Sequence, residues 1–241
     1  MMNTFNTAMQ LILLWGVLGI AGFFSCAILL RFALSCYHKQ RLASEKKVVS
    51  KVVGITGTIA SGKSLVGTIL EELGVPVLDT DHIAHYVQAN VEDVRAALRS
   101  RFGADVFKAN GELDRKKLGG IVFNDASALK DLNHIVHPAT IRECRRRIAT
   151  HADKPLVAVL VPLLFEAGLE KEYDEIWTVT ARDEIVRERL KAREKISDEE
   201  ADKRIRAQYP QREKIARSHH VIDNSGTVDD TRRQVRELLG L

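Results

Sequence analysis

A single eight-residue stretch restricts the possible folds of this chain more than any other feature of its sequence. Residues 57–64 read GTIASGKS, which has the spacing G-x-x-x-x-G-K-S. An apolar, β-branched run at 52–56 precedes it and predicts a buried strand. Residues 64–73 follow it with apolar side chains at helical spacing. A strand, a glycine-containing loop and a helix in this order are typical of a phosphate-binding loop (P-loop) in an α/β fold.

The residue types in this loop predict how a nucleoside triphosphate is held. Gly57 and Gly62 let the backbone turn its N–H groups toward phosphate oxygens, and the N-terminus of the following helix adds partial positive charge. Lys63 is expected to reach the β- and γ-phosphates, and the Ser64 hydroxyl to hold Mg²⁺. The residues expected to surround the phosphates are Gly57, Thr58, Ile59, Ala60, Ser61, Gly62, Lys63, Ser64 and Leu65.

The basic charge of the chain is concentrated at its N-terminus. The 241 residues carry a formal net charge of +4. Residues 1–48 contain five Lys or Arg and one Glu, a difference of four, so residues 49–241 are neutral overall. The larger part therefore carries no bulk charge that would indicate a nucleic-acid partner. The three cysteines form no CxxC pair, which argues against a zinc site or a disulfide framework.

Residues 8–30 form an uncharged segment of 23 residues. At about 1.5 Å per residue a helix of this length would be about 34 Å long, enough to cross a membrane. Basic residues follow the segment, which by the positive-inside rule keeps its C-terminal side in the cytosol. We therefore expect a single-pass transmembrane anchor and basic linker at 1–48 and a cytosolic catalytic domain at 49–241. One alternative is a mitochondrial targeting segment, since the first acidic residue is Glu45. The other is a dispensable extension.

The rest of the chain alternates short apolar runs with helical patterns, which predicts a parallel sheet with helices on both faces. Residues 82–150 are expected to be mainly helical, with interruptions near Gly103, Asn110-Gly111 and His137-Pro138. A charged helical region follows at 182–206. Further strands are expected at 76–81, 156–161, 176–180 and 221–224, and a closing amphipathic helix at 229–239.

Missing motifs exclude two classes of P-loop protein. A GTPase would need a DxxG switch and an N/TKxD guanine loop, and neither occurs. A large ATPase would show an apolar strand ending in Asp, whereas the run at 156–161 ends at Pro162. A small-molecule kinase fits better, because it needs an acid near the acceptor hydroxyl and an Arg-rich lid over the transferring phosphoryl group.

Further motifs follow the loop in a fixed order. They are VPVLDTDHIAH at 75–85, FGADVFKANGELDRKKLGGIVF at 102–123, LNHIVHP at 132–138, VPLLFEAGL at 161–169, RERLKAR at 187–193, RIRAQ at 204–208 and VIDNSG at 221–226. With GITGTIASGKS at 54–64, they make residues 50–240 resemble the dephospho-coenzyme A kinases. The IASGKS variant and the apolar extension look more like eukaryotic members. The resemblance implies a P-loop kinase fold with a helical acceptor-binding region and a mobile lid. It also implies phosphorylation of the ribose 3′-hydroxyl of dephospho-coenzyme A by ATP with Mg²⁺.

The resemblance implies acceptor-side roles for single residues. Asp81 matches the second Asp of the family's DxD motif and is expected to be the base for the acceptor hydroxyl; a helix N-cap is the alternative. Asp79 is expected near the acceptor, near Mg²⁺ waters or Lys63, or in a structural turn. The acceptor-binding residues implied are Asp79, Arg115, His137 and Glu166. A surface arginine and a helix-breaking His-Pro turn are the alternatives for Arg115 and His137.

On the nucleotide side, Arg189 and Arg193 are four residues apart and share one helix face over the transferring phosphoryl group. A salt-bridged surface helix is the alternative. Asn224 ends a strand where the adenine is expected. The expected catalytic set is Asp81, Lys63 and Arg193. The chain departs from the family pattern in having Thr58, Ala60 and Leu65 in place of Gly, Gly and Thr, and Val186 in place of Gln.

Two other functions stay open from the sequence. One is a membrane-tethered nucleotide-binding scaffold that has lost catalysis, against which the intact Lys63, Ser64, Asp81 and Arg193 argue. The other is a kinase for a different small nucleotide acceptor, against which the LDR, HP and PLLFE motifs argue.

Overall fold

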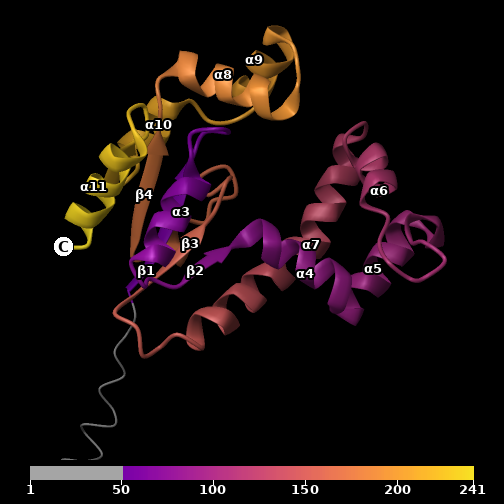
Figure 1. Cartoon of the computed structure of the whole chain (residues 1–241). Helices are drawn as coiled ribbons and strands as arrows, with labels where there is room; N and C mark the ends of the chain where they lie inside the picture. Colours follow the sequence, from indigo (N-terminus) through magenta and orange to yellow (C-terminus); the bar gives the residue numbers. More distant parts are fainter. Residues whose placement is uncertain (1–50) are drawn as a thin grey trace, which may run out of the picture. The chain divides into compact units, whose positions relative to one another are not determined.

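The computed structural model describes residues 51–241, and within them five strands form one parallel sheet (Figure 1). The strands are β1 Lys51–Gly57, β2 Val77–Asp79, β3 Leu156–Leu160, β4 Glu175–Thr180 and β5 His220–Asp223. Their order across the sheet is β2-β3-β1-β4-β5, and every neighbouring pair is parallel. The parallel α/β sheet predicted from the sequence is confirmed. Strand β2 is shorter than predicted, because helix α4 already begins at Thr80.

Alternating side chains of the strands contribute to two separate cores, one on each face of the sheet. In β1, Val53 and Ile55 pack with residues of α3 (Lys63–Glu72) and α11 (Val228–Leu238), whereas Val52 packs into the other core. In β4, Trp177 lies in the same core as Val53 and Ile55 and is almost fully buried. Removing a side chain of this size from a core costs about 3–5 kcal/mol. Helices therefore cover both faces, as the sequence predicted.

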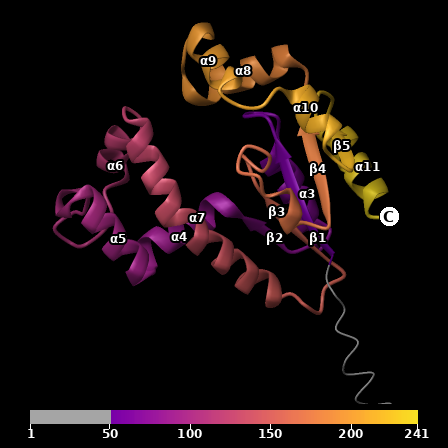
Figure 2. The same ribbon diagram turned by 180° about the vertical axis from the view of Figure 1, so that it is seen from behind.

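Between β2 and β3 the chain forms a helical region, visible beside the sheet in Figures 1 and 2, whose apolar side chains share one core with that face of the sheet. Its helices are α4 Thr80–Asn90, α5 Glu92–Phe102, α6 Arg115–Val122 and α7 Ala126–Ala149, with a short 3₁₀ turn at Ala104–Val106. Gly103 and Gly111 have positive φ, which ends α5 and closes the loop before α6. The interruptions predicted at those two positions are confirmed.

The predicted interruption at His137-Pro138 is wrong, because α7 continues through Pro138 as a helix of 24 residues. A proline inside a helix removes one hydrogen bond and costs about 3 kcal/mol. The buried stripe of α7, with Val136, Ala139 and Cys144, packs into the helical region and offsets this cost. The Thr140 hydroxyl also donates to the Val136 carbonyl at 2.9 Å, one turn away. Tertiary packing therefore overrides the local helix-breaking signal.

The charged region after β4 folds into helices α8 Asp183–Glu194 and α9 Asp198–Arg206, followed by α10 Gln211–Ala216. The turn between α8 and α9 contains Lys195 in a left-handed conformation, and the Ser197 hydroxyl caps α9. Both views show α8 and α9 at the end of the sheet where the loop from β1 to α3 lies (Figures 1 and 2). We call the segment 182–207 the lid.

No helix within residues 51–241 is both long and apolar enough to span a membrane. The transmembrane helix predicted at 8–30, and the whole anchor and linker at 1–48, lie outside the described residues.

Candidate active site

The loop between β1 and α3 has positive φ angles and close backbone contacts that require glycine at two positions. Gly57 and Gly62 have φ of +153° and +106°. A Cβ atom on Gly62 would lie 1.8 Å from the Asn224 amide nitrogen, and one on Gly57 would lie 2.2 Å from the Val179 carbonyl oxygen. Ala60, which stands where the family pattern has Gly, is also left-handed with φ of 61°. A side chain as small as a methyl group tolerates this conformation at a cost of about 1–2 kcal/mol.

Helix α3 begins at this loop without a side-chain cap, so its first N–H groups face outward from the helix end. Within the described part of the chain, the backbone N–H groups of Gly62, Lys63 and Ser64 have no hydrogen-bond acceptor. Unpaired N–H groups and the positive end of a helix dipole together form an anion-binding site. The arrangement predicted for a nucleotide phosphate is therefore present.

Lys63 lies against the loop that precedes it. Its Nζ donates to the carbonyl oxygen of Gly57 at 3.0 Å and approaches that of Thr58 at 3.4 Å. Burial lowers the pKa of Lys63 to about 8; the charge of Lys214 acts in the same direction and that of Asp81 in the opposite one. An anionic phosphate beside this ammonium group would restore its charge.

Ser64 offers an exposed hydroxyl at the first turn of α3, as a P-loop magnesium ligand requires. No group of three or more metal-ligating side chains occurs among residues 51–241. Mg²⁺ in phosphoryl-transfer sites usually keeps several waters and binds the substrate phosphates, so one protein hydroxyl fits this ion.

Two carboxylates, Asp79 and Asp81, lie at the carboxyl end of β2. In the sheet, β3 separates β2 from β1, the strand that precedes the phosphate loop. The Asp79 Oδ1 accepts from the backbone N–H of Asp81 at 2.8 Å and of His82 at 3.4 Å. Asp79 is thus the N-cap of α4, and the cap role considered for Asp81 is wrong, because the helix begins two residues earlier than predicted. Capping occupies one oxygen of Asp79 and leaves Asp81 available for chemistry.

Asp81 lies in the first turn of α4. Burial raises the pKa of Asp81, and the neighbouring charge of Asp79 raises it further. The charges of His85 and Lys63 act in the opposite direction. A carboxylate with a raised pKa, in the same electrostatic environment as Lys63, has the properties of a general base.

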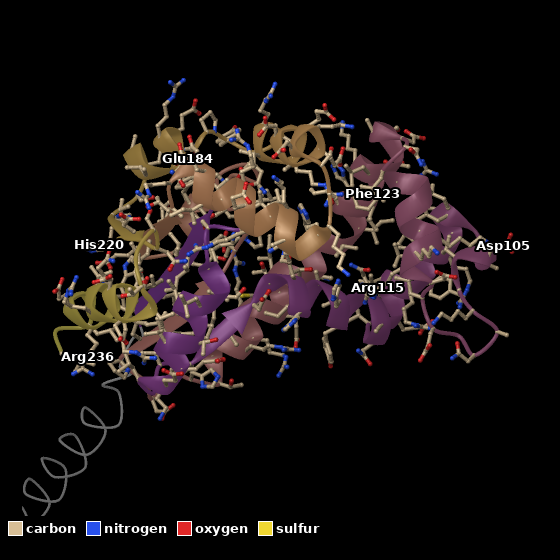
Figure 3. The ribbon with its side chains drawn as sticks, turned by 45° about the horizontal axis from the view of Figure 1, so that its top comes forward. Asp105, Arg115, Phe123, Glu184, His220 and Arg236 are labelled. Atoms are coloured by element: carbon tan, nitrogen blue, oxygen red, sulfur yellow. The ribbon has the colours of Figure 1, made fainter. Side chains whose placement is uncertain are left out.

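Arg115 lies at the start of α6 and is held against α4. Its guanidinium donates to the Gln88 side chain at 3.2 Å and to the His85 carbonyl at 3.1 Å. Figure 3 shows Arg115 and Phe123 on the side of the helical region nearer the lid, with Asp105 far from it. Helix α4 therefore carries both Asp81 and the anchor points of Arg115.

His137 is the predicted site residue that the structure leaves apart from the others. It lines a surface cavity of about 380 Å³ on α7, together with Leu129, Asn133 and Pro138. Burial lowers its pKa, and the charge of His134 lowers it further. Among the described residues, no hydrogen bond or ion pair joins His137 to the phosphate loop or to Asp81.

Glu166, predicted to bind the acceptor, is engaged elsewhere. Its Oε1 lies 2.7 Å from the Nζ of Lys214 and accepts from the Tyr209 backbone N–H at 3.0 Å. Burial raises the pKa of Glu166, but the ion pair with Lys214 and the hydrogen bond from Tyr209 outweigh it and leave this pKa below its usual value. The geometry gives Glu166 a structural role at the base of the lid rather than that of an open carboxylate.

The two lid arginines lie one turn apart on α8, as predicted. Arg189 donates from one nitrogen to the Asn224 carbonyl at 3.1 Å, and its other terminal nitrogen is buried with no hydrogen-bond partner among the described residues. Arg193 is half exposed and pairs with Glu194 at 2.9 Å, so part of the salt-bridged surface alternative is also present. The positive charge of Arg193 nevertheless lowers the pKa of Lys63, which shows that the two cations interact electrostatically.

Asn224 links the phosphate loop to helix α11. Its amide nitrogen donates to the Ser61 carbonyl at 2.8 Å, and its side-chain oxygen accepts from the Thr231 hydroxyl at 2.9 Å. The residue is 2% exposed. With both polar ends occupied, the Asn224 side chain positions the loop, which differs from the adenine contact predicted for it.

The model of the dephospho-CoA kinase family matches residues 51–230. The chain belongs to this family. It is 42% identical over 189 residues to the dephospho-CoA kinase of Geobacillus kaustophilus, covering 78% of this chain and 94% of that protein. Its fold is similar to a crystal structure of TT1252 from Thermus thermophilus, with a TM-score of 0.68, 36% identity and coverage of 79% and 97%. It is also similar to the dephospho-CoA kinase of Campylobacter jejuni, with a TM-score of 0.61, 27% identity and coverage of 78% and 95%.

The match to the dephospho-CoA kinase family supports the kinase activity predicted from the sequence. The predicted likeness to eukaryotic members with a membrane segment is not supported by these comparisons. The matched region begins at residue 51, so residues 1–50 lie outside it.

Two residues with long-range contacts near the site, Lys214 and Gln208, were not singled out by the sequence analysis. Lys214 is completely buried, although the pattern QREKIA around it is typical of an exposed helix. Gln208 accepts from the Ile59 backbone N–H at 2.8 Å through its side chain. Its position at the end of the family stretch RIRAQ was the only available signal, and for Lys214 there was none, because burial depends on distant parts of the chain.

Proposed function

We propose that this chain transfers the γ-phosphoryl group of ATP to the ribose 3′-hydroxyl of dephospho-coenzyme A, giving coenzyme A and ADP. The observation that carries the proposal is the placement of Lys63 and Asp81 after two strands of one sheet, near enough for the charge of each to act on the other. They lie at the carboxyl ends of β1 and β2, and each perturbs the pKa of the other. Membership of the dephospho-CoA kinase family supports this acceptor.

In the proposed reaction, the 3′-hydroxyl oxygen forms a bond to the γ-phosphorus while the bond from that phosphorus to the β,γ-bridging oxygen of ATP breaks. The hydroxyl proton passes to the Asp81 carboxylate, and the negative charge passes to ADP. Lys63 and the N–H groups at the start of α3 stabilise that charge, while Arg193 neutralises the transferring phosphoryl group. Ser64 would hold Mg²⁺, which would supply further charge neutralisation for the transfer.

On the acceptor side, the proposal assigns Arg115 to the acceptor phosphates and His137 to a contact farther along the acceptor. The side chain of Arg115 is fixed in place by two hydrogen bonds to α4, the helix that carries Asp81. Such fixation reduces the entropy lost on binding an anion. The exposed face around His137 offers an open cavity on α7.

A coupled assay with ATP and dephospho-coenzyme A tests the proposal, using full-length protein and residues 49–241 in parallel. Production of ADP and of a 3′-phosphorylated product is expected. Adenosine monophosphate in place of dephospho-coenzyme A tests for another nucleotide acceptor. Tight ATP binding with no transfer to either acceptor would favour the scaffold alternative and contradict the proposal.

We also propose that residues 8–30 anchor the chain in a membrane once, with the catalytic domain in the cytosol. The support is the uncharged 23-residue segment and the basic residues after it. Full-length protein is expected in the membrane fraction after alkaline carbonate extraction, and residues 49–241 in the soluble fraction. Recovery of the full-length protein entirely in the soluble fraction would exclude the anchor, and co-purification with mitochondria would favour the targeting alternative.

A further inference from the structure

The segment 208–214, which follows the lid, is attached at several points to the surroundings of the phosphate loop. We propose that it is a fixed stem on which the lid turns, and that Gln208 and Glu166 are positioning residues for phosphoryl transfer. The proposal rests on the proposed kinase function, because it concerns where the lid arginines stand relative to the phosphate loop.

The first attachment joins the stem to the tip of the phosphate loop. The Gln208 side-chain oxygen accepts from the Ile59 backbone N–H at 2.8 Å, across 149 positions of sequence. Ile59 precedes the three unpaired N–H groups at residues 62–64 that face the phosphate position. The bond therefore fixes the tip of the loop without using any of those three groups.

The second attachment lies one residue further along the chain and includes a buried lysine. The Tyr209 backbone N–H donates to Glu166, which follows β3, and the same oxygen lies 2.7 Å from Lys214. Lys214 is 0% exposed, and its Nζ and the Glu166 Oε2 have no hydrogen bond of good geometry among the described residues. A buried ion pair is seldom a net source of stability, and its best-attested use is to specify one arrangement.

The third attachment joins the two ends of the lid to each other. The Gln211 side chain accepts from the Ala181 backbone N–H at 3.3 Å and donates to the Ala181 carbonyl at 3.0 Å. Ala181 immediately precedes the lid, and Gln211 begins α10. Entry and exit of the lid are therefore held together, so that α8 and α9 project from a single base.

The consequence concerns the position of Arg193, which the lid carries toward Lys63. Phosphoryl transfer depends mainly on positioning, and displacing a group by about 1 Å from outside the chemistry can reduce the rate about 10²-fold. A loosened stem should therefore slow transfer while leaving ATP bound, because the unpaired N–H groups and Lys63 remain in place.

Gln208→Met tests the first attachment, since Met keeps the length and removes the acceptor. Gln234→Met is the matched control, because Gln234 also bonds to backbone, at Asp223, but does not connect the lid to the loop. In the full-length protein, Gln208→Met is expected to lower single-turnover transfer about 10–100-fold. Its MgATP dissociation constant should change less than about threefold, and its melting temperature should match that of Gln234→Met. Equal transfer rates in the two variants would overturn the proposal.

Amide exchange at Ile59 gives a readout that is independent of the acceptor. The exchange rate is expected to rise at least about tenfold in Gln208→Met and to stay unchanged in Gln234→Met. If the wild type transfers nothing to dephospho-coenzyme A, the proposed function fails. The exchange rate at Ile59 still tests whether Gln208 holds the phosphate loop. An unchanged rate at Ile59 in Gln208→Met would overturn the stem.

Two double variants test the buried attachment without leaving an unpaired charge. Glu166→Gln with Lys214→Met keeps an acceptor for the Tyr209 N–H, and Glu166→Leu with Lys214→Met removes it. The first is expected to transfer within about threefold of wild type and the second about tenfold more slowly, at matched MgATP affinity. Wild-type transfer by a folded leucine variant would contradict the buried attachment; if that variant does not fold, the Gln208 measurements decide.

Discussion

Replacing Asp81 by Asn separates chemistry from helix capping at the end of β2. Because Asp79 caps α4 through bonds of 2.8 and 3.4 Å, Asp81→Asn removes a proton acceptor and leaves the cap intact. General-base assistance contributes about 10² to 10⁴ in rate. This corresponds to about 3–5 kcal/mol of transition-state stabilisation. We expect that loss in single-turnover transfer, with little change in melting temperature or MgATP affinity.

The neighbouring residue supplies the matched controls. Asp79→Ala loses the cap, which costs about 1 kcal/mol and lowers the melting temperature by about 2–4 °C for a domain of this size. Asp79→Asn keeps the cap. Since the charge of Asp79 raises the pKa of Asp81, Asp79→Asn should also move the acid limb of the pH–rate profile to lower pH.

The assay measures MgATP affinity, melting temperature and single-turnover transfer on the same preparations, across a pH series. In the wild type, transfer is lost as the pH falls through the raised pKa of Asp81, because the protonated carboxyl cannot accept the hydroxyl proton. A loss of less than about tenfold in Asp81→Asn would refute its role as the base. A larger loss in Asp79→Asn than in Asp81→Asn would transfer that role to Asp79.

Three further outcomes are expected at the phosphate loop. Lys63→Ala should abolish transfer with an unchanged melting temperature, checked by circular dichroism, and near wild-type turnover would refute the P-loop assignment. MgATP affinity of the wild type, followed by calorimetry, should weaken as the pH rises through the Lys63 pKa of about 8, because the ammonium loses its charge; a flat profile would contradict that pKa. Gly62→Ala should abolish nucleotide binding, since its Cβ would meet Asn224 at 1.8 Å. As a control, Gly74→Ala, beyond the end of α3, should leave binding intact: φ is +81°, no other described residue lies within 4 Å of the added Cβ, and the strain is only about 1–2 kcal/mol.

The parts of the fold that depend on local pattern were predictable from the sequence. Buried parallel strands are continuous apolar runs, so β1, β3 and β4 were found within a residue or two. The phosphate loop was equally clear, because its glycines and lysine lie next to each other in the chain. The site residues that act through this local motif, such as Lys63 and Ser64, lie where the motif requires them.

The errors came from interactions between distant segments. Pro138 reads as a helix end, but the packing of α7 holds the helix through it. Lys214 reads as a surface residue until Glu166, some fifty positions earlier, is brought beside it. Asp81 was the cap considered from the sequence, but α4 begins two residues earlier than predicted and Asp79 caps it, a precision that residue patterns do not provide.

The strand order sets when, during synthesis, the nucleotide site can exist. Among the described strands, β1 pairs with β3 and β4 alone, and their residues follow it by more than a hundred positions. At about 5–20 residues per second, a ribosome leaves β1 without partners for at least about 5 s, while the helices between β2 and β3 already have local contacts. ATP can therefore stabilise the finished domain and slow its unfolding, but it has no site to bind while the chain is still folding.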